Sequence, residues 1–563
     1  MRNLKTFSAV LALGVMPLSA SAQQSVASSK TEIVDKIAAQ ERAEMQLLRQ
    51  YSPLVETYIQ NLRPDEQGGV ALDTDKYFLG RAHLAKGVEL EPLIHSAGNK
   101  RNVFGALHNF FSTEYVPSGF LQMIFLDENG FDRQHYNFAY VQREFLGEVR
   151  CLVFDVDPLV KGQKGRFVGR IWVEDQDYHV VRFNGTYNGS SRTSYYFNFD
   201  SWRQNVGKNQ WLPTFVYSEE GRGQNSSTKN IVPQAFRSQT RLWGYALGRI
   251  QEEQELSKIL VETTVKDQTD AANDYSPLQA ERSWSRLAEN NVAVSLERIG
   301  LMAPHGDVDK VLETVVNNLE VTNNLDIEPE VRCRVLMTST LESFTMGHTI
   351  VVSRGLMDVL PDEASLAAIL AHELGHVVLG HRMDTQFAFF NRLRFDEKET
   401  FRHFGFARTS EEEQAANQKG IELLMHSPYK DQVRTAQRFL QALQSRSKEI
   451  PNLISPHLGD RVPTTWTITS AISGAEPSGA TAANAMTALP LGGRVKVEPW
   501  SDQLQLLKSK PAGAVAEYEK MPFMVAPIVL YLTRQGDSFS AEVPGAVAVK
   551  SDTDSNRDES NAS

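Results

Sequence analysis

Cysteine is scarce in this chain of 563 residues, which contains only Cys151 and Cys333. Two cysteines exclude a disulfide framework, and they also exclude a cysteine-rich zinc site. The pair is compatible with one bridge in an oxidising compartment or with two separate buried thiols, and the sequence leaves both arrangements open.

Positive charge is also in deficit, because 58 Lys and Arg residues are outnumbered by 69 Asp and Glu residues. The formal net charge of −11 argues against nucleic-acid binding, which needs an excess of basic side chains to neutralise phosphates. We therefore expect no nucleic-acid partner. The composition is otherwise ordinary for globular proteins, and a chain of this length is expected to form several domains.

Long apolar runs are missing beyond the N-terminus, where the longest candidate, residues 521–532, contains two prolines and suits a buried core segment better than a membrane span. The N-terminus itself begins with Arg2 and Lys5, continues with a short apolar stretch at 7–18, and reaches small residues at Ala20 and Ala22. This order predicts a signal peptide at 1–22 and an exported protein, periplasmic or secreted. The alternative is an N-terminal membrane anchor.

Changes in residue pattern along the chain predict an α+β protein in which an antiparallel β-rich domain precedes a mostly helical domain. We expect a helical N-terminal segment at 23–95, the β-rich domain at 96–266, a polar linker at 267–284, the helical domain with one strand pair at 285–470, a flexible connector at 471–488, a small C-terminal segment at 489–546 and a disordered tail at 547–563.

The β-rich region contains successive β-branched and aromatic runs, such as 167–173 and 178–183, parted by a polar turn. Because strand follows strand without helical patterns between them, we expect an antiparallel sheet or half-barrel. The stretch GRFVGRIWVEDQDYHVVRFNGTY resembles strands of the open β-barrel carriers that sort bacterial outer-membrane lipoproteins. Any curved sheet with an aromatic face has the same pattern, so a contact with lipoproteins or a membrane surface remains one of two interpretations.

Residues 366–381 predict a helix that carries His372, Glu373 and His376. The two histidines are four residues apart, so both imidazoles project from one face with the spacing that a single tetrahedral metal needs. Glu373 lies beside them and is placed to act on water without being a ligand. The alternative is a helix with two solvated histidines, but its apolar faces indicate that they are buried.

The third ligand distinguishes the classes of zinc peptidase. A metzincin has Gly and His where this chain has Leu379 and Arg382, so that class is excluded. A carboxylate from a second helix is the other common solution. Residues 410–424 predict such a helix, on which Glu413 shares a face with small residues.

The sequence GHTIVVSRGLMDVLPDEASLAAILAHELGHVVLGH, followed by EEEQAANQKGIELLMHSPY, resembles the HtpX-like and BepA-like peptidases, in the family of the CAAX prenyl proteases. The resemblance covers about residues 285–470. It implies one Zn²⁺ per chain, bound by His372, His376 and Glu413. It also implies that Glu373 is the general base that activates a zinc-bound water. Asn417 replaces the usual Asp, and its amide oxygen is still able to accept from a ligand imidazole.

Members of this family carry a His-Pro…Arg element over the metal, and His457 and Arg461 are the candidates here. The resemblance implies a role in oxyanion stabilisation or in gating the metal, and the alternative is an ordinary loop. Residues 348–353 predict a strand just before the metal helix, either at an edge that pairs with a substrate peptide or in the sheet interior.

We therefore expect a zinc metalloendopeptidase that hydrolyses unfolded or misassembled exported and envelope proteins. The alternative is a periplasmic binding or chaperone module for lipoprotein, lipid or unfolded clients, with a structural or latent zinc site.

Overall fold

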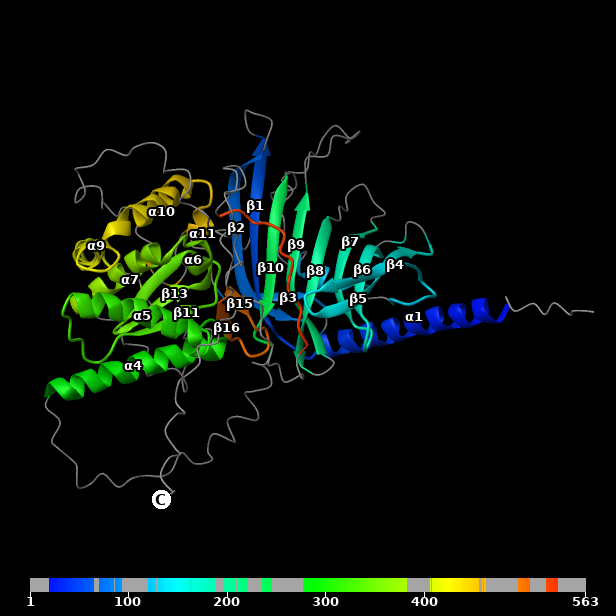
Figure 1. Ribbon diagram of the computed structural model, residues 1–563, viewed down its shortest axis with the longest axis horizontal. Coiled ribbons are helices and arrows are strands. Elements are labelled where there is room, and N and C mark those ends of the chain that lie inside the picture. Colours follow the sequence, from blue (N-terminus) through cyan, green and yellow to red (C-terminus); the bar gives the residue numbers. More distant parts are fainter. Residues whose placement is uncertain are drawn as a thin grey trace, which may run out of the picture.

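The computed structural model describes residues 20–64, 70–85, 87–93, 120–127, 130–160, 165–188, 197–207, 210–220, 235–245, 277–381, 408–454, 495–506 and 523–534, with single positions 163, 406, 458, 460 and 461. The chain has the expected α+β class: a large antiparallel sheet lies beside a compact, mostly helical unit (Figure 1).

The antiparallel sheet has the order β3-β2-β1-β10-β9-β8-β7-β6-β5-β4 within the described residues. Its strands are β1 (Leu54–Pro64), β2 (Val70–His83), β3 (Glu89–Pro92), β4 (Tyr136–Leu146), β5 (Val149–Pro158), β6 (Phe167–Glu174), β7 (Val180–Tyr187), β8 (Asn198–Gly207), β9 (Gln210–Glu220) and β10 (Phe236–Trp243). A 3₁₀ turn, η2 (Gln122–Ile124), precedes β4. The first and last of these strands, β1 and β10, pair in the middle of the sheet.

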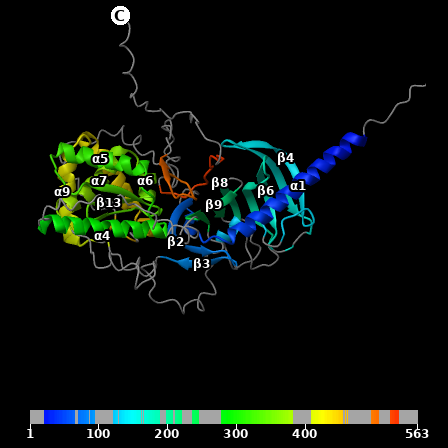
Figure 2. The same ribbon diagram turned by 90° about the horizontal axis from the view of Figure 1, so that it is seen from below.

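Helix α1 (Ala20–Leu48) packs on one face of the sheet and crosses its strands obliquely (Figure 2). Val34, Ile37 and Leu48 are buried there, as expected for one stripe of an amphipathic helix. Buried ion pairs supplement this packing: Arg203 donates two hydrogen bonds to Glu41, at 2.7 and 2.8 Å. The helix is therefore bound to the sheet by both apolar and charged contacts.

The expected helical segment at 23–95 is wrong beyond Leu48, because β1, β2 and β3 follow. Pro53 comes soon after the end of the helix, and a proline cannot continue one. The next residues include Val55, Thr57 and Ile59, which favour strands. These residues form a strand because they pair with β10, almost two hundred residues away, and local periodicity does not reveal such a partner.

The helical unit contains a small sheet and the helices around it. Its elements are α4 (Pro277–Ile299), α5 (Asp307–Thr322), β11 (Arg332–Leu336), β12 (Glu342–Met346), β13 (Thr349–Ser353), α6 (Arg354–Val359), α7 (Glu363–Val378), α9 (Ser410–Met425), η4 (Lys430–Gln432), α10 (Val433–Arg446), α11 (Pro451–Ile454) and β14 (Asp460–Arg461). Helix α4 begins inside the expected linker at 267–284. Proline is tolerated in the first turn of a helix, so Pro277 marks its start.

The small sheet has the order β11-β13-β12-β14, and therefore β13 is an interior strand. The interpretation of residues 348–353 as an edge strand is wrong: β13 pairs in parallel with β11 and antiparallel with β12. The parallel partner β11 comes before β12 in the chain, so its pairing with β13 cannot be inferred from the sequence of β13 itself.

The large sheet and the helical unit are joined by buried hydrogen bonds. Glu56 on β1 accepts from the backbone N–H and the hydroxyl of Ser339, both at 2.6 Å. Asp75 on β2 accepts from the backbone N–H groups of Asn452 and Leu453, at 3.0 and 2.9 Å. Because buried polar groups are costly to separate from their partners, these bonds fix the relative position of the two units.

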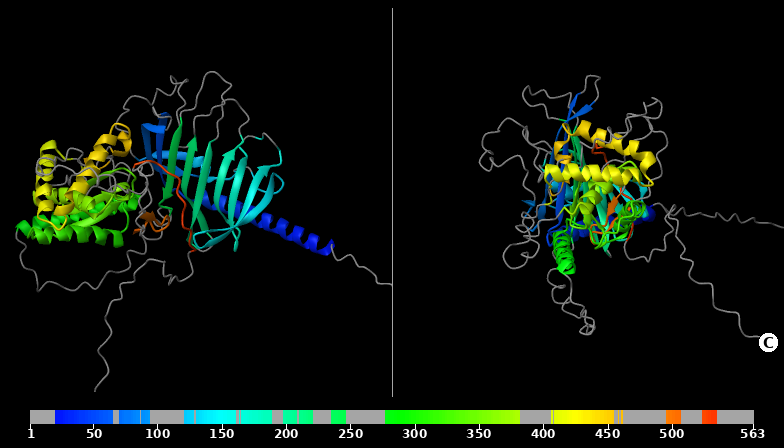
Figure 3. Two further views of the ribbon diagram at one scale, coloured as in Figure 1. Left: turned by 45° about the horizontal axis from the view of Figure 1, so that its top comes forward. Right: turned by 90° about the vertical axis from the view of Figure 1, so that its left-hand side faces the viewer.

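The C-terminal segment returns to the large sheet. A hairpin of β15 (Val495–Val497) and β16 (Leu504–Leu506) lies between the sheet and the helical unit, and residues 523–534 run along the sheet face opposite α1 (Figure 3). Gln60 on β1 donates to the Phe523 carbonyl at 2.6 Å and accepts from the Val525 N–H at 2.7 Å. The expectation of a buried core segment at 521–532 is confirmed only in part for the described residues: Phe523, Met524, Val525 and Leu532 are buried, whereas Val529 and Tyr531 are exposed.

Cys151 and Cys333 are both free and buried, which settles the choice in favour of two separate thiols. None of the helices in the described part of the chain combines the length and the hydropathy that a membrane span requires. Residues 1–19 of the expected signal peptide, the connector at 471–488 and the tail at 547–563 lie outside the described residues.

Candidate metal centre

Helix α7 supplies two histidines and one glutamate to the centre. Its first turn is capped by Asp362, whose carboxylate accepts from the Ser365 N–H at 2.8 Å. The helix then runs through the core, so that His372, Glu373 and His376 are all at most 1% exposed. The interpretation of these histidines as solvated surface residues is therefore wrong.

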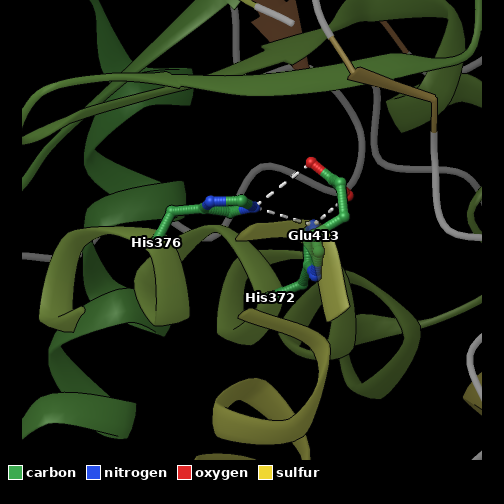
Figure 4. Close-up of side chains that lie close together, drawn as sticks. All are labelled: His372, His376 and Glu413. Atoms are coloured by element: carbon green, nitrogen blue, oxygen red, sulfur yellow. Dashed lines mark hydrogen bonds and ion pairs between the residues drawn. The ribbon is translucent and has the colours of Figure 1, made fainter. Parts of the chain in front are cut away.

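Helix α9 supplies the third predicted ligand, and glycines allow it to approach α7 closely. A Cβ atom at Gly420 would lie 2.9 Å from the Ala371 carbonyl oxygen, and one at Gly375 would lie 2.7 Å from the Ala416 carbonyl oxygen. Only glycine fits at both positions without moving a backbone. This close contact brings Glu413, in the first turns of α9, over the histidines (Figure 4).

The three predicted ligands converge on one point. His372 Nε2 lies 3.3 Å from His376 Nε2 and 3.4 Å from Glu413 Oε2, and His376 Nε2 lies 3.5 Å from Glu413 Oε1. Zinc binds such atoms at about 2.0–2.1 Å in a tetrahedron, which places neighbouring ligand atoms about 3.3 Å apart. The observed separations match that value, so the residues fit the ion.

Unsatisfied acceptors support the same conclusion. Glu413 Oε1 is buried without a hydrogen-bond partner in the described part of the protein. Burial alone raises the pKa of Glu413, but the facing imidazoles of His372 and His376 outweigh it and lower the pKa to about 2. Glu413 is thus an anion at every ordinary pH. A partly buried carboxylate that faces two imidazoles is the donor set that a dication requires.

Glu373 is fully buried beside the ligands and differs from them in its environment. Its Oε1 accepts from the Ser343 hydroxyl on β12 at 2.6 Å, while its Oε2 has no hydrogen-bond partner among the described residues. Burial raises the pKa of Glu373 to about 7. A carboxylate with this pKa is suited to exchange protons near neutral pH.

His381 contacts the centre from outside. Its Nδ1 lies 2.8 Å from Nδ1 of His376, on the ring side opposite the candidate metal position. His381 is therefore a neighbour of a ligand and not a ligand. Asn417 Oδ1 has no hydrogen-bond partner within the described residues, so the expected amide contact to a ligand imidazole is not formed.

The candidates His457 and Arg461 are not both described. His457 lies outside the described residues, and Arg461 is described only through its backbone, which pairs with Glu342 as part of β14. This pairing places β14 alongside β12, the strand that carries Ser343. Ser343 itself was missed by sequence reasoning, because no local spacing connects a strand residue with a glutamate thirty positions later.

Comparisons with known proteins agree with this geometry. Residues 304–457 match the model of Peptidase family M48. The chain is also similar to the Metalloprotease LoiP of Escherichia coli (strain K12), with 38% identity over 73 residues. That match covers 13% of this chain and 27% of the relative, so the chain spans about a quarter of the curated relative's length.

The family match includes α7 and α9, which carry every predicted ligand. It confirms the family resemblance that the motifs around His372 and Glu413 indicated. The chain thus carries, at residues 304–457, a metalloprotease domain of peptidase family M48.

Proposed function

We propose that the chain is a zinc-dependent endopeptidase that hydrolyses peptide bonds in exported or envelope proteins. The observation that carries the proposal is the convergence of His372, His376 and Glu413 at tetrahedral spacing, with the proton acceptor Glu373 buried beside them. These are the groups that hydrolysis of an amide needs: a metal position and a base.

His372, His376 and Glu413 would hold one zinc ion per chain. When bound, zinc supplies Lewis acidity, which polarises a carbonyl group and makes water acidic enough to ionise near neutral pH. His381 fixes the ring of His376 through its second nitrogen, and such partners orient metal ligands.

Glu373 is the proton carrier of the proposed reaction. Its free Oε2 accepts the proton of the attacking water, and the Ser343 hydroxyl holds Oε1 in place. Because its pKa is close to 7, Glu373 also releases that proton to the leaving amine without a large energetic cost.

Strand β12 is the proposed platform for the substrate. Among the described residues, β14 pairs only with Glu342 and Ser343 of β12, and no other described strand pairs with the outer side of Phe344–Met346. Arg408 donates to the Thr345 carbonyl at 3.1 Å, so a peptide that pairs along this edge would have to displace that side chain. An extended peptide that pairs there would pass close to Glu373, since Ser343 bridges the strand and the base. Recognition through backbone hydrogen bonds depends little on the substrate sequence, and it favours unfolded or misassembled chains because their backbone is accessible.

The proposed cellular role rests on the sequence alone. The predicted signal peptide supports an exported protein, periplasmic or secreted, and the large sheet is the proposed unit that recruits protein, lipoprotein or membrane-surface partners. Its curved antiparallel architecture is consistent with a binding role but does not name a client.

Metal analysis and a hydrolysis assay on the mature protein test the proposal. We expect one zinc per chain, casein hydrolysis that a chelator abolishes and zinc restores, and no zinc in Glu413→Gln. Exposed Glu411 on the same helix is the matched control, because Glu411→Gln should keep zinc and activity. A purified protein that contains zinc but never cleaves casein would favour the binding or chaperone alternative.

A further inference from the structure

A cavity of about 270 Å³ lies on the face of the large sheet opposite α1, far larger than the roughly 30 Å³ that one water occupies in the liquid. Three parts of the chain form its walls: strands β8 to β10, the start of α6 with the end of β11, and the C-terminal stretches at 495–499 and 528–531. The cavity contains none of the candidate metal ligands, and so it is separate from the peptidase centre.

Two arginines line this cavity, one from each unit. Arg241 on β10 and Arg354 at the start of α6 are only 6% and 7% exposed. Arg354 donates to the Val495 carbonyl through Nε at 3.3 Å and Nη2 at 3.0 Å. Burial, with the nearby positive charge of Arg241, lowers the pKa of Arg354 to about 9. Two buried guanidinium groups therefore lie close enough to repel each other.

Arg241 has an unused hydrogen-bond donor. The Gln239 amide oxygen, when turned toward Arg241, accepts from Nε and Nη2 at 2.5 and 3.0 Å, but buried Nη1 has no hydrogen-bond partner among the described residues. The nearest carboxylate oxygens, on Glu56 and Asp358, lie 4.0 and 3.9 Å from the guanidinium, beyond hydrogen-bond distance. A buried donor of this kind is rare unless a ligand or water completes it.

The carboxylates of Glu56 and Asp358 accept hydrogen bonds from other groups. Glu56 accepts from Ser339 and, at 2.7 Å, from the Tyr77 hydroxyl. Asp358 accepts from the Val495 N–H at 3.0 Å. Neither carboxylate can turn toward Arg241 without losing these bonds, so among the described residues no carboxylate completes Nη1, and the cavity is open to an acceptor from a ligand.

The remaining walls are mostly apolar. Phe215 and Trp243 from the sheet, Met337 from the helical unit, and Val497, Ile528 and Leu530 from the C-terminal stretches line the space. Val529 and Tyr531 at this site are 75% and 61% exposed, so apolar side chains continue to the surface. The site thus combines two guanidinium groups, which have the carboxylates of Glu56 and Asp358 within 4.0 Å, with an apolar path to solvent.

We propose that this cavity binds a medium-chain fatty acid, with its carboxylate on Arg241 and Arg354 and its hydrocarbon chain along the apolar wall. Guanidinium groups are the preferred partners of carboxylates in buried sites, because they donate in a planar fork. The bound acid would touch the sheet, the helical unit and the C-terminal stretch at once.

Isothermal titration calorimetry of the full-length mature protein with decanoate tests the proposal. We expect one decanoate per chain and no heat from decyltrimethylammonium, which has the same tail and the opposite charge. Arg241→Met should weaken decanoate binding at least about tenfold, the loss expected for one charged hydrogen bond. Arg237 lies on the same strand but outside the cavity, so Arg237→Met is the matched control and should leave binding unchanged.

A second variant tests binding to the cavity without removing a buried arginine. Val497 is half-buried and lines the cavity, so Val497→Trp should fill the apolar path and prevent binding while the protein stays folded. Equal binding of decanoate and decyltrimethylammonium, or unchanged decanoate binding in Val497→Trp, would overturn the proposal. Tighter binding of an apolar peptide acid, such as N-acetyl-valyl-leucine, would overturn the assignment to a fatty acid.

Discussion

The large sheet and the metalloprotease domain both bury charged side chains, but they treat them differently. In the sheet, opposite charges pair: Arg203 with Glu41, and Arg166 with Asp127 at 2.5 Å. In the metalloprotease domain, two carboxylates, Glu413 and Glu373, lie beside two histidines with no Lys or Arg among the described groups that converge there. The comparison teaches that burial alone does not mark a reactive site. A cluster of carboxylates and histidines that could bind one metal ion does.

The largest expected effect separates chemistry from folding. Glu373→Gln removes the proton acceptor but keeps the shape of the side chain, and we expect casein turnover to fall by about 10²–10⁴-fold. Zinc content and thermal stability should remain those of the wild type. Wild-type turnover in this variant, with Glu411→Gln measured beside it, would refute the role of Glu373.

The second effect acts on the sheet and spares the metal. Glu41→Gln leaves Arg203 buried without its carboxylate, so the free energy of unfolding should fall by about 3–5 kcal/mol. The control is Glu32→Gln on the same helix, because Glu32 pairs with Lys36 at the exposed surface, where such pairs contribute little. Urea unfolding measures this free energy. An equal decrease in Glu41→Gln and Glu32→Gln would contradict the prediction.

A smaller effect is expected at the contact between α7 and α9. Gly420→Ala introduces a Cβ 2.9 Å from the backbone of His372, which should move Glu413 away and lower stability by about 1–3 kcal/mol. Zinc affinity, measured by competition with a chelating dye, should fall as well. Gly306→Ala meets no atom closer than 3.8 Å, and zinc affinity should not change in it.

The smallest effect concerns pH. The Ser343 hydroxyl stabilises the carboxylate form of Glu373, so Ser343→Ala should raise the pKa of Glu373 by up to about one unit. Glu373 has to be ionised to accept a proton. The acid limb of kcat/KM should therefore move to higher pH, while Ser445→Ala on the exposed part of α10 leaves it in place. An unmoved acid limb would show that Ser343 does not tune the base.

The parts of the site that share one helix were predictable from sequence. His372, Glu373 and His376 are fixed by helical spacing, and Glu413 by the family motif together with the small face of its helix. Ser343 and His381 were not, because their contacts depend on how β12 and the end of α7 pack in space. Neither contact follows from the spacing of the residues.

The fold was predictable in class and less so in detail. Alternating strands predicted the antiparallel sheet, but β1 was interpreted as helix because its partner β10 is distant in sequence. The same cause accounts for β13, whose interior place depends on the parallel strand β11. Long-range pairing, which no local period encodes, explains both errors.

The hydrogen bonds of Gln60 to Phe523 and Val525 have a consequence for handling the protein. They connect residues 523–525 to a strand near the beginning of the chain without a covalent bond between the two. A single cut of the backbone between residues 461 and 495 would therefore leave both fragments associated. They would co-migrate on a sizing column and separate only on a denaturing gel.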